Sequence, residues 1–459
     1  YMEDMKNGKR SSFSGKLGYV LAAAGASVGL GNIWRFPYLA AKYGGGIFLI
    51  IYIVLALTFG YTMIVAETAI GRMTRKSPVG AFKSFGKKKW LSFGGWINAV
   101  IPVLIVPYYS VIGGWVIKYL VEYFRGNAKL LAEDGYFTDF ISNGVSTELC
   151  FVAFCAFTLI IIFAGVQNGI ERVSKIMMPI LIVLSVIIAV YSVTRPGALA
   201  GVKYFLVPNV KNFSWMTVVA AMGQMFYSLS IAMGILITFG SYMKKDTAIE
   251  DSTRNVEIFD TGIAIMAGLM IIPAVFAFSG GDPDTLQAGP SLMFITIPKV
   301  FQNMGFGTVI GIVFFLLVLF AAVTSSIALT ESAVSTFEDE LGWGRKKATV
   351  LVGVIMLALG SLSSLGYGPL AGIKIIGMQF LDLFDFLTNS VMMPIAALLT
   401  SLLVSRVVGI DKIEEEIIHG ESAFKRKKVF VVMIKYLCPV FAIIILLSSV
   451  ANALGWIKM

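Results

Sequence analysis

Two short segments rich in glycine and serine interrupt apolar stretches of this 459-residue chain. The first runs from Gly25 to Asn32 and the second from Ser228 to Gly234. Because glycine destabilises a helix interior by about 1 kcal/mol relative to alanine, both segments favour a local break of the helix. A broken helix frees backbone carbonyls, which together with nearby hydroxyl and amide oxygens can bind a hard cation. The segments therefore predict a cation site, although small residues also let two helices pack closely.

Other chemistries have little support in the residues. The three cysteines, Cys150, Cys155 and Cys438, lie within or at the edge of apolar runs and have no metal-binding or redox spacing. The single histidine, His419, lies in a charged segment. We therefore predict neither a Cys/His metal centre nor an enzyme.

The elements that must position the two segments are long and apolar. The chain is 57% hydrophobic and 14% charged, whereas soluble domains contain about 25% charged residues. A helix needs about 20 apolar residues to cross a bilayer. Eleven runs without Asp, Glu, Lys or Arg predict an all-α polytopic membrane protein with eleven transmembrane helices. The runs are Leu17–Trp34, Tyr43–Ala66, Trp90–Ile117, Phe151–Ile170, Ile176–Thr194, Asn212–Met243, Thr261–Gly281, Val300–Thr330, Ala348–Ile373, Phe386–Ser405 and Tyr436–Ile457.

The interrupted helices are the first and the sixth of the eleven, so they occupy matching places in two groups of five. Such paired breaks indicate a 5+5 inverted repeat with a binding site near the membrane midplane. The predicted units are an N-terminal segment (1–15), a first repeat (16–195), a loop (196–212), a second repeat (213–406), another loop (407–428) and an eleventh helix (429–459). The apolar connection 280–299 predicts a loop that caps a vestibule.

The net charge of +10 could indicate a nucleic-acid partner, but its distribution favours membrane insertion. When connections are assigned alternately to the two sides, most of the 37 Lys and Arg fall on the side of the N-terminus. We therefore expect a protein of the cell (plasma) membrane with its N-terminus in the cytoplasm. Because the number of spans is odd, the C-terminus is expected outside. The lipid bilayer is the expected partner, with no nucleic acid and no obligate protein partner.

Ionisable residues at membrane depth are costly and mark functional sites. Asp260 precedes an apolar run, and Arg35 follows the first break. Both are candidates on this ground, although Asp260 could also be a residue at a helix end.

The segment Gly31–Tyr38, with the sequence Gly-Asn-Ile-Trp-Arg-Phe-Pro-Tyr, resembles a signature of the neurotransmitter:sodium symporter family. Further similarities follow in the expected order at Gly289–Pro298, Ala321–Ala328 and Glu338–Glu340. The resemblance covers nearly the whole chain and is strongest to bacterial members with the leucine-transporter fold; the twelfth helix of longer relatives is absent. It implies sodium-coupled uptake.

The resemblance also implies two sodium sites. The first would comprise Ser27, Asn32, Ser228 and Asp260, completed by the substrate carboxylate. The second would use the carbonyls of Gly25, Val28 and Ala321 with the hydroxyls of Thr324 and Ser325. These two hydroxyls could instead bond back to their own helix.

Asp260 departs from the family pattern, which has Asn at this position. Chloride-dependent animal members have a serine one turn later, where this chain has Ala264. A fixed carboxylate can balance the cation in a site of low dielectric. We therefore expect two sodium ions as cofactors and no chloride requirement.

The expected substrate is a hydrophobic L-amino acid. The half-helix that begins near Leu30 offers N–H groups and a positive dipole to a carboxylate, and the resemblance adds the hydroxyl of Tyr109. Gly29 leaves room for the main chain, whereas monoamine transporters carry Asp there. Met233 replaces a phenylalanine of the leucine transporter and can repack around different shapes. The full predicted set is Ser27, Gly29, Leu30, Gly31, Ile105, Tyr109, Tyr227, Ser228, Ser230, Met233, Ser325 and Leu329.

Two gates complete the resemblance. Arg35 and Asp385 match an outer pair, near Gln224, with Tyr109 and Tyr227 closing below it and Asp382 one turn away. Arg10 and Asp339 match an inner pair, near Tyr242, with Phe13 where the family usually has Trp. Gly169 and Pro179 resemble a pattern that lets the fifth helix unwind, although a simple proline kink is the alternative.

The leading hypothesis is thus a sodium-coupled symporter that works by alternating access. An amino-acid-gated channel would need a continuous pore lined by rings of carbonyls or charges, which two asymmetric breaks do not suggest. A non-transporting amino-acid sensor stays open as a third hypothesis.

Overall fold

The computed structural model describes residues 10–281 and 290–458, and this part of the chain is almost entirely helical. Within it, nine helices are long and apolar enough to cross a membrane, and the bent pair Lys16–Ser27 and Gly31–Lys42 makes a tenth span. The predicted sixth span is divided into α13 with 14 residues and α14 with 7, each too short to cross alone. The predicted all-α polytopic architecture is confirmed.

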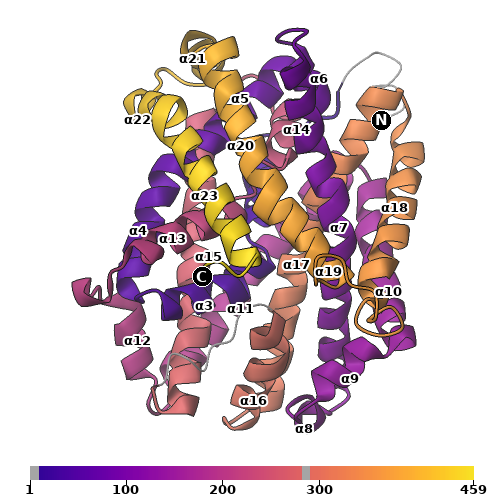
Figure 1. Ribbon diagram of the computed structural model, residues 1–459, viewed down its shortest axis with the longest axis vertical. Coiled ribbons are helices and arrows are strands. Elements are labelled where there is room, and N and C mark those ends of the chain that lie inside the picture. Colours follow the sequence, from indigo (N-terminus) through magenta and orange to yellow (C-terminus); the bar gives the residue numbers. More distant parts are fainter. Residues whose placement is uncertain (1–9, 282–289, 459) are drawn as a thin grey trace.

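The first part of the bundle runs to residue 193 (Figure 1). Its elements are α2 (Lys16–Ser27), η1 (Gly31–Arg35), α3 (Phe36–Lys42), α4 (Gly46–Leu55), η2 (Ala56–Gly60), α5 (Tyr61–Thr74), α6 (Pro78–Lys83), α7 (Lys89–Phe124), α8 (Ala128–Leu131), α9 (Tyr136–Ser142), α10 (Gly144–Phe163), η3 (Val166–Glu171) and α11 (Arg172–Val193).

The second part begins with a connection that carries α12 (Leu199–Leu206) and η4 (Val210–Asn212). Its further elements are α13 (Trp215–Ser228), α14 (Ile235–Ser241), α15 (Ile249–Ser279), η6 (Leu292–Thr296), α16 (Ile297–Gln302), α17 (Gly307–Leu341), α18 (Arg345–Leu365), α19 (Phe380–Asp385), η7 (Phe386–Met392), α20 (Met393–Leu402), η8 (Leu403–Val408), α21 (Ile410–Ile418), α22 (Lys427–Val432), η9 (Met433–Leu437) and α23 (Cys438–Ala453).

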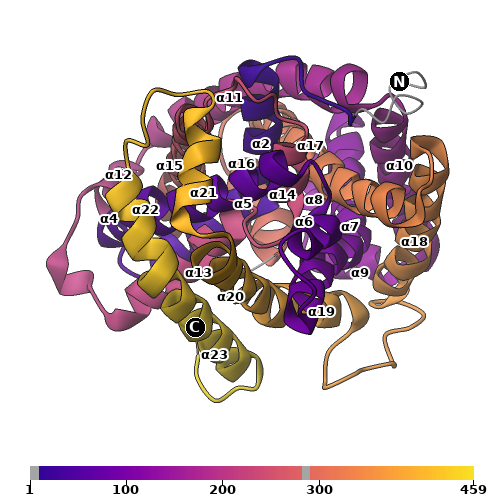
Figure 2. The ribbon, with the colours of Figure 1, turned by 90° about the horizontal axis from the view of Figure 1, so that it is seen from above.

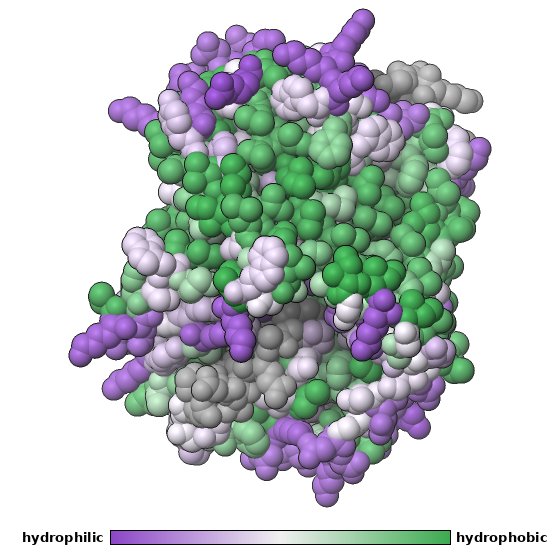
Figure 3. Space-filling view, viewed as in Figure 1, coloured by the Kyte–Doolittle hydropathy of each residue, from purple (hydrophilic) through white to green (hydrophobic). Residues whose placement is uncertain are grey.

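The surface of the bundle shows why it belongs in a membrane. Apolar side chains such as Ile160, Val183, Val354 and Leu447 are exposed along the outer helices. On the face shown in Figure 3, hydrophobic residues form a broad band across the middle of the molecule, and hydrophilic residues gather mainly toward its two ends. Soluble proteins rarely expose so large a continuous apolar surface, whereas lipid tails accept it.

The two ends of the bundle differ in their elements. One end carries α6 and α21, and the opposite end carries α8, α9, α12 and α16 (Figure 1). We call the first the inner end and the second the outer end, following the orientation predicted from the charges. Lys427 of α22 pairs with Glu414 of α21 at the inner end, whereas Asn452 of α23 lines a cavity at the outer end. The segment from α22 to α23 therefore runs from the inner end to the outer cavity.

Helices α7 and α17 pack along each other, and α14 packs against α5. Seen from above, these elements surround the centre, whereas α10, α18 and α23 lie at the periphery (Figure 2). The two interrupted helices thus lie between long, continuous ones that hold the break segments in place.

A buried arginine connects α5 to α21 at the inner end. The guanidinium of Arg72 on α5 is fully buried and donates to the carboxylate and carbonyl of Glu416 on α21, at 2.8 and 2.6 Å. It also donates to the carbonyls of Lys244 and Thr247. Counting charges assigns Arg72 to the cytoplasmic side but does not reveal its burial. Although burial opposes it, hydrogen bonds from Lys245 and Arg72 hold the pKa of Glu416 below its usual range.

Three predicted boundaries need correction. The run Val300–Thr330 is divided, because α16 ends at Gln302 and α17 begins at Gly307. The run Phe151–Ile170 is not one helix, because α10 ends at Phe163 and η3 begins at Val166, with Gly165 at φ +98° between them. Only glycine adopts such a backbone readily. The connection 280–299 ends as helix from Leu292 rather than as a loop. Residues 282–289, which include Gly289 of the similar segment, lie outside the described residues, as do residues 1–9 of the predicted N-terminal segment.

Candidate substrate and ion site

The first break lies where α2 meets the middle of α17. Helix α2 ends at Ser27, Val28 leaves the helical region with φ −81° and ψ 88°, and the helix resumes at Gly31. The Ser325 hydroxyl of α17 lies 3.0, 3.3 and 3.4 Å from the carbonyl oxygens of Gly25, Ala26 and Val28. The carbonyls freed by the break are therefore gathered around one hydroxyl.

The remaining members of the predicted second sodium site lie beside them. The Thr324 hydroxyl donates to the carbonyls of Phe320 and Ala321 at 2.9 and 3.1 Å, so it bonds back to its own helix. A Cβ added at Gly25 would lie 3.0 Å from the Thr324 Cβ, so α2 and α17 approach closely here. The structure thus brings Gly25, Val28, Ala321, Thr324 and Ser325 together, with Ser325 alone bonded across to α2.

The second break separates α13 from α14. Ser230, Ala232 and Gly234 have φ values of +55°, +60° and +77°, which a regular helix cannot accommodate. The Ser230 hydroxyl donates to the Ala26 carbonyl at 2.7 Å and so joins the two breaks. The buried Glu67 carboxylate accepts the Ala232 N–H at 3.1 and 3.2 Å, a contact that sequence reasoning missed.

Asp260 lies between the two breaks and is fully buried on α15. Its carboxylate accepts from Ser228 Oγ at 2.6 Å and from Asn32 Nδ2 at 3.2 Å. The Ser228 hydroxyl is also 2.8 Å from Asn32 Oδ1. Three of the four residues of the predicted first sodium site therefore share one hydrogen-bonded cluster, and the fourth, Ser27, lines the adjoining cavity.

Tyr52 is a further member of this cluster. Its buried hydroxyl donates to the second carboxylate oxygen of Asp260 at 2.6 Å. Nothing in the apolar run around Tyr52 singles it out, because the contact joins residues 208 positions apart. In the described part of the chain, no three His, Cys, Asp or Glu side chains gather as they would around a transition metal. Apart from the Asp260 carboxylate, the side-chain oxygens of this cluster are neutral, and oxygen ligands suit a hard cation.

A cavity of about 50 Å³ adjoins the Asp260 cluster, and no charged side chain among the described residues lines it. Its walls include all of the predicted substrate residues: Ser27, Gly29, Leu30, Gly31, Ile105, Tyr109, Tyr227, Ser228, Ser230, Met233, Ser325 and Leu329. Ala26, Asn32 and Asn389 complete the lining. Asn389 is a residue that sequence reasoning missed.

One wall of this cavity is suited to a carboxylate. The Leu30 N–H, at the start of the resumed half-helix, donates to the Tyr109 hydroxyl at 3.3 Å. A Cβ added at Gly29 would lie 2.7 Å from Ser325 Oγ and 3.1 Å from the Tyr109 oxygen. Glycine is therefore required for this close approach. The lining residues Ile105, Met233 and Leu329 are apolar.

A second cavity of about 320 Å³ lies toward the outer end and shares Leu30, Tyr109 and Tyr227 with the first. Arg35 and Asp385 both line it but do not form an ion pair in the described structure. The Arg35 guanidinium lies 5.0 Å from the centre of the Tyr227 ring, a cation–π arrangement. The predicted outer pair is thus apart, and its role as a gate stays a prediction.

Two other residues predicted near the outer gate, Gln224 and Asp382, make hydrogen bonds. Gln224 Nε2 donates to the Gly31 carbonyl at 3.3 Å, at the start of the half-helix. Asp382 accepts from the Tyr367 hydroxyl at 3.1 Å. Pro290, in the described part of the capping connection, lines the outer cavity as expected of a cap.

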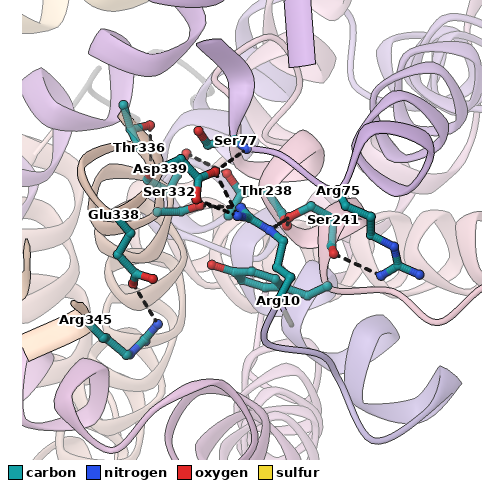
Figure 4. Close-up of polar contacts among 12 residues, drawn as sticks. Arg10, Arg75, Ser77, Thr238, Ser241, Ser332, Thr336, Glu338, Asp339 and Arg345 are labelled. Carbon is teal, nitrogen blue, oxygen red and sulfur yellow. Dashed lines mark hydrogen bonds and ion pairs between the residues drawn. The ribbon is translucent and has the colours of Figure 1, made fainter. Parts of the chain in front are cut away.

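The predicted inner residues are in direct contact (Figure 4). Arg10 donates to both carboxylate oxygens of Asp339, at 2.7 and 2.8 Å. It also donates to the hydroxyls of Ser241 and Ser335 at 2.8 and 2.7 Å. Although burial lowers it, the neighbouring Tyr242 and Asp339 raise the pKa of Arg10 overall. Arg10 and Asp339 therefore form an ion pair at the inner end, and its role as a gate stays a prediction.

Aromatic side chains pack around this ion pair. Phe13 is buried and makes edge contacts with Tyr19, Phe239 and Tyr242. Its N–H donates to the Tyr242 carbonyl at 2.9 Å, and the Arg10 guanidinium lies 5.1 Å from the Tyr242 ring centre. Phenylalanine thus fills the position at which the family usually has Trp.

In the fifth predicted span, Gly169 lies within the π-helical segment η3 and Pro179 within the regular helix α11. The helix is therefore irregular around Gly169 and regular around Pro179. Whether this segment unwinds further stays a prediction.

Comparison with known proteins places this geometry in a family. The model of the sodium:neurotransmitter symporter family matches residues 10–134 and 137–455. An uncharacterized sodium-dependent transporter of Bacillus subtilis, YhdH, is 34% identical over 97% of this chain and 99% of its own length. One of Haemophilus influenzae is 31% identical over 96% of this chain and 99% of its own.

Among solved structures, the crystal structure of MhsT in complex with L-phenylalanine is similar, with 35% identity and a TM-score of 0.85. The match covers 96% of this chain and 100% of that one. The broken helices, the buried oxygen cluster and these similarities lead to one conclusion: the chain belongs to the sodium:neurotransmitter symporter family, whose members are sodium-dependent membrane transporters rather than enzymes.

Proposed function

We propose that this protein imports neutral hydrophobic L-amino acids, aliphatic and aromatic, together with two sodium ions. The observation that carries the proposal is that the central cavity has both a polar and an apolar lining. One part offers the Leu30 N–H and the Tyr109 hydroxyl to a carboxylate. The other offers apolar side chains and, among the described residues, no charge.

The charge balance of the cavity favours a zwitterion. The half-helix end attracts the carboxylate, and the carbonyl groups freed near Ser228 and Ser230 are expected to accept from the ammonium group. A lysine or glutamate side chain would be buried without a partner, at a cost of several kcal/mol. Each extra buried methylene contributes about 0.8 kcal/mol, so affinity should rise with side-chain size until the pocket is full. In MhsT the bound ligand is L-phenylalanine, which is consistent with this class of substrate.

The Asp260 cluster suggests how sodium and substrate bind together. A sodium ion at Asn32, Ser228 and Asp260 would lie beside the cavity that Asn32 and Ser228 also line. The substrate carboxylate could then complete its ligands, so that each ligand strengthens the binding of the other. Because Asp260 supplies a fixed negative charge, the first ion should need no chloride.

Alternating access requires two gates that close in turn. The inner pair, Arg10 and Asp339, is closed, whereas the outer pair, Arg35 and Asp385, is apart. This arrangement favours a transporter over a channel, which would need a continuous pore. It does not distinguish a transporter from a sensor.

Uptake in proteoliposomes tests the proposal. An inward sodium gradient should drive accumulation of labelled leucine, and a potassium gradient should not. Unlabelled tryptophan, phenylalanine and isoleucine should compete, whereas lysine, glutamate and free monoamines should not. Binding without accumulation would indicate a sensor, and strong competition by a monoamine would contradict the assignment of the cavity.

A further inference from the structure

Asp385, the expected outer-gate partner of Arg35, is held by other residues. Its carboxylate oxygen Oδ1 accepts from the Tyr108 hydroxyl at 3.1 Å and from the amide of Asn389. The same amide nitrogen donates to the Tyr108 oxygen at 3.1 Å. The three side chains therefore form a closed triangle in which every pair is hydrogen-bonded.

The triangle lies between the two cavities. Asn389 lines the central cavity, whereas Tyr108 and Asp385 line the outer one. Tyr108 is also the chain neighbour of Tyr109, which lines both cavities and accepts from the Leu30 N–H. A ligand in the central cavity would thus contact the triangle through Asn389 directly and through Tyr109 by way of α7.

The helix carrying the triangle is irregular at this point. Asp385 is the last residue of α19, and Asn389 lies in the π-helical segment η7. Such wide turns are frequent at functional sites. Asp385 and Asn389 are four residues apart on one helix, and both contact Tyr108.

We propose that Asn389 is a positioning residue that couples occupancy of the central cavity to closure of the outer gate. While Asn389 and Tyr108 hold Asp385, Arg35 stays on the Tyr227 ring and the gate is open. When the substrate side chain packs against Asn389, the amide shifts and Asp385 is released to pair with Arg35. This inference rests on the proposed function, because it takes the central cavity to be the amino-acid site.

The inference predicts how loss of the triangle shifts the equilibrium between the open and the closed outer gate. Without the Asn389 amide, Asp385 keeps one partner fewer and is attracted more readily to Arg35. Asn389→Leu, which has a similar volume and no polar atom, should therefore close the outer gate even without amino acid. Tyr108→Phe removes a different hydrogen bond of the same triangle and should act in the same direction.

A cysteine reporter in the outer cavity measures this equilibrium. Ile112, which lines that cavity, is changed to cysteine in a protein whose Cys150, Cys155 and Cys438 are replaced by alanine. The rate of alkylation by a membrane-impermeant maleimide is measured in sodium without amino acid, so that altered substrate affinity cannot affect it. We expect Asn389→Leu to slow alkylation about tenfold, which corresponds to about 1.4 kcal/mol in the gate equilibrium.

Two further variants separate coupling from a general structural effect. Tyr367→Phe is the matched control, because its hydroxyl donates to Asp382 and not to Asp385; its rate should equal that of the parent. Adding Arg35→Ala to Asn389→Leu removes the partner onto which Asp385 would close and should restore the parent rate. A structural defect at position 389 would not be restored in this way.

The outcomes decide between the alternatives. An Asn389→Leu protein that alkylates at the parent rate overturns the inference, and so does a slow rate that Arg35→Ala does not restore. The proposed function has its own readout in the parent reporter, where L-phenylalanine with sodium should slow alkylation. Failure of that response would count against the amino-acid site, whereas a normal response with unaffected variants would count against Asn389 alone.

Discussion

Replacing Asp260 by asparagine tests the central electrostatic argument. The carboxylate is fully buried and has three donors: Tyr52 and Ser228 at 2.6 Å and Asn32 at 3.2 Å. The asparagine side chain would be nearly the same size, and its amide oxygen in place of Oδ1 could still accept from Ser228 and Asn32. Its amide nitrogen would then face the Tyr52 hydroxyl, which now donates to Oδ2 and could instead accept. The substitution therefore removes charge with little loss of hydrogen bonding.

The magnitude follows from Coulomb's law. Two unit charges about 4 Å apart interact with about 4 kcal/mol at an effective dielectric constant of about 20. Part of this is offset, because a neutral amide costs less to keep dehydrated than a carboxylate does. We expect a net loss of about 10- to 100-fold in apparent sodium affinity, or about 1.4 to 2.8 kcal/mol.

Sodium titration of leucine uptake in proteoliposomes measures this loss. The wild type should transport equally well in chloride and in gluconate, because Asp260 supplies the negative charge. In the Asp260→Asn background, Ala264→Ser should restore part of the sodium affinity in chloride medium only. An unchanged sodium affinity in Asp260→Asn would show that the carboxylate does not contact the ion, and a steep loss of wild-type uptake in gluconate would refute the charge-balance argument.

Four further predictions concern the second sodium site, the gates and the pocket. Thr324→Ala combined with Ser325→Ala removes two hydroxyl ligands worth about 1 kcal/mol each and should reduce sodium-driven uptake by about tenfold or more; wild-type rates would eliminate this site. Arg35→Ala should speed dissociation of bound labelled leucine several-fold with little change in melting temperature, and an unaltered dissociation rate would mean that Arg35 does not gate. Met233→Phe should weaken tryptophan more than leucine in competition assays, because a rigid ring replaces a flexible chain; equal effects would mean that the side-chain pocket is misplaced. Asp339→Asn breaks the bidentate inner pair and should increase alkylation of a cysteine at the inner end several-fold, whereas equal rates would show that serine and aromatic contacts suffice for closure.

Much of the site was predictable because its residues are local in sequence. The two breaks are visible as glycine and serine within apolar runs, and Leu30, Ser228 and Met233 lie in them or next to them. Residues on other helices, such as Tyr109 and Leu329, came from the family resemblance, because an apolar helix gives no local sign of which face lines a cavity.

The missed residues share a physical reason. Tyr52 and Glu67 act through partners 208 and 165 positions away, and nothing in their own segments reports these contacts. Asn389 is different, because it lies four residues after Asp385 and a helix places such pairs on one face. That spacing could have predicted the contact with Asp385, although not the contact with Tyr108.

The fold was predictable in type but not in every boundary. Absence of charge identifies a helix that can cross the membrane, but it cannot locate a turn inside an apolar run. The turn at Gly165 between α10 and η3 is such a case, since glycine also occurs within transmembrane helices. Burial of Arg72 was likewise out of reach, because an arginine after an apolar run usually indicates the aqueous side.

The close approach at Gly29 has an evolutionary consequence. Every glycine codon is one nucleotide change away from codons for alanine, aspartate or glutamate, and valine, so these variants arise readily. Each of them adds a Cβ that would lie 2.7 Å from Ser325 Oγ and 3.1 Å from the Tyr109 oxygen. A lineage that gained an acidic residue here, as an amine-specific descendant would need, would first have to make room at position 325. Under the proposed function, a change of substrate class through position 29 would therefore depend on the side chain at position 325.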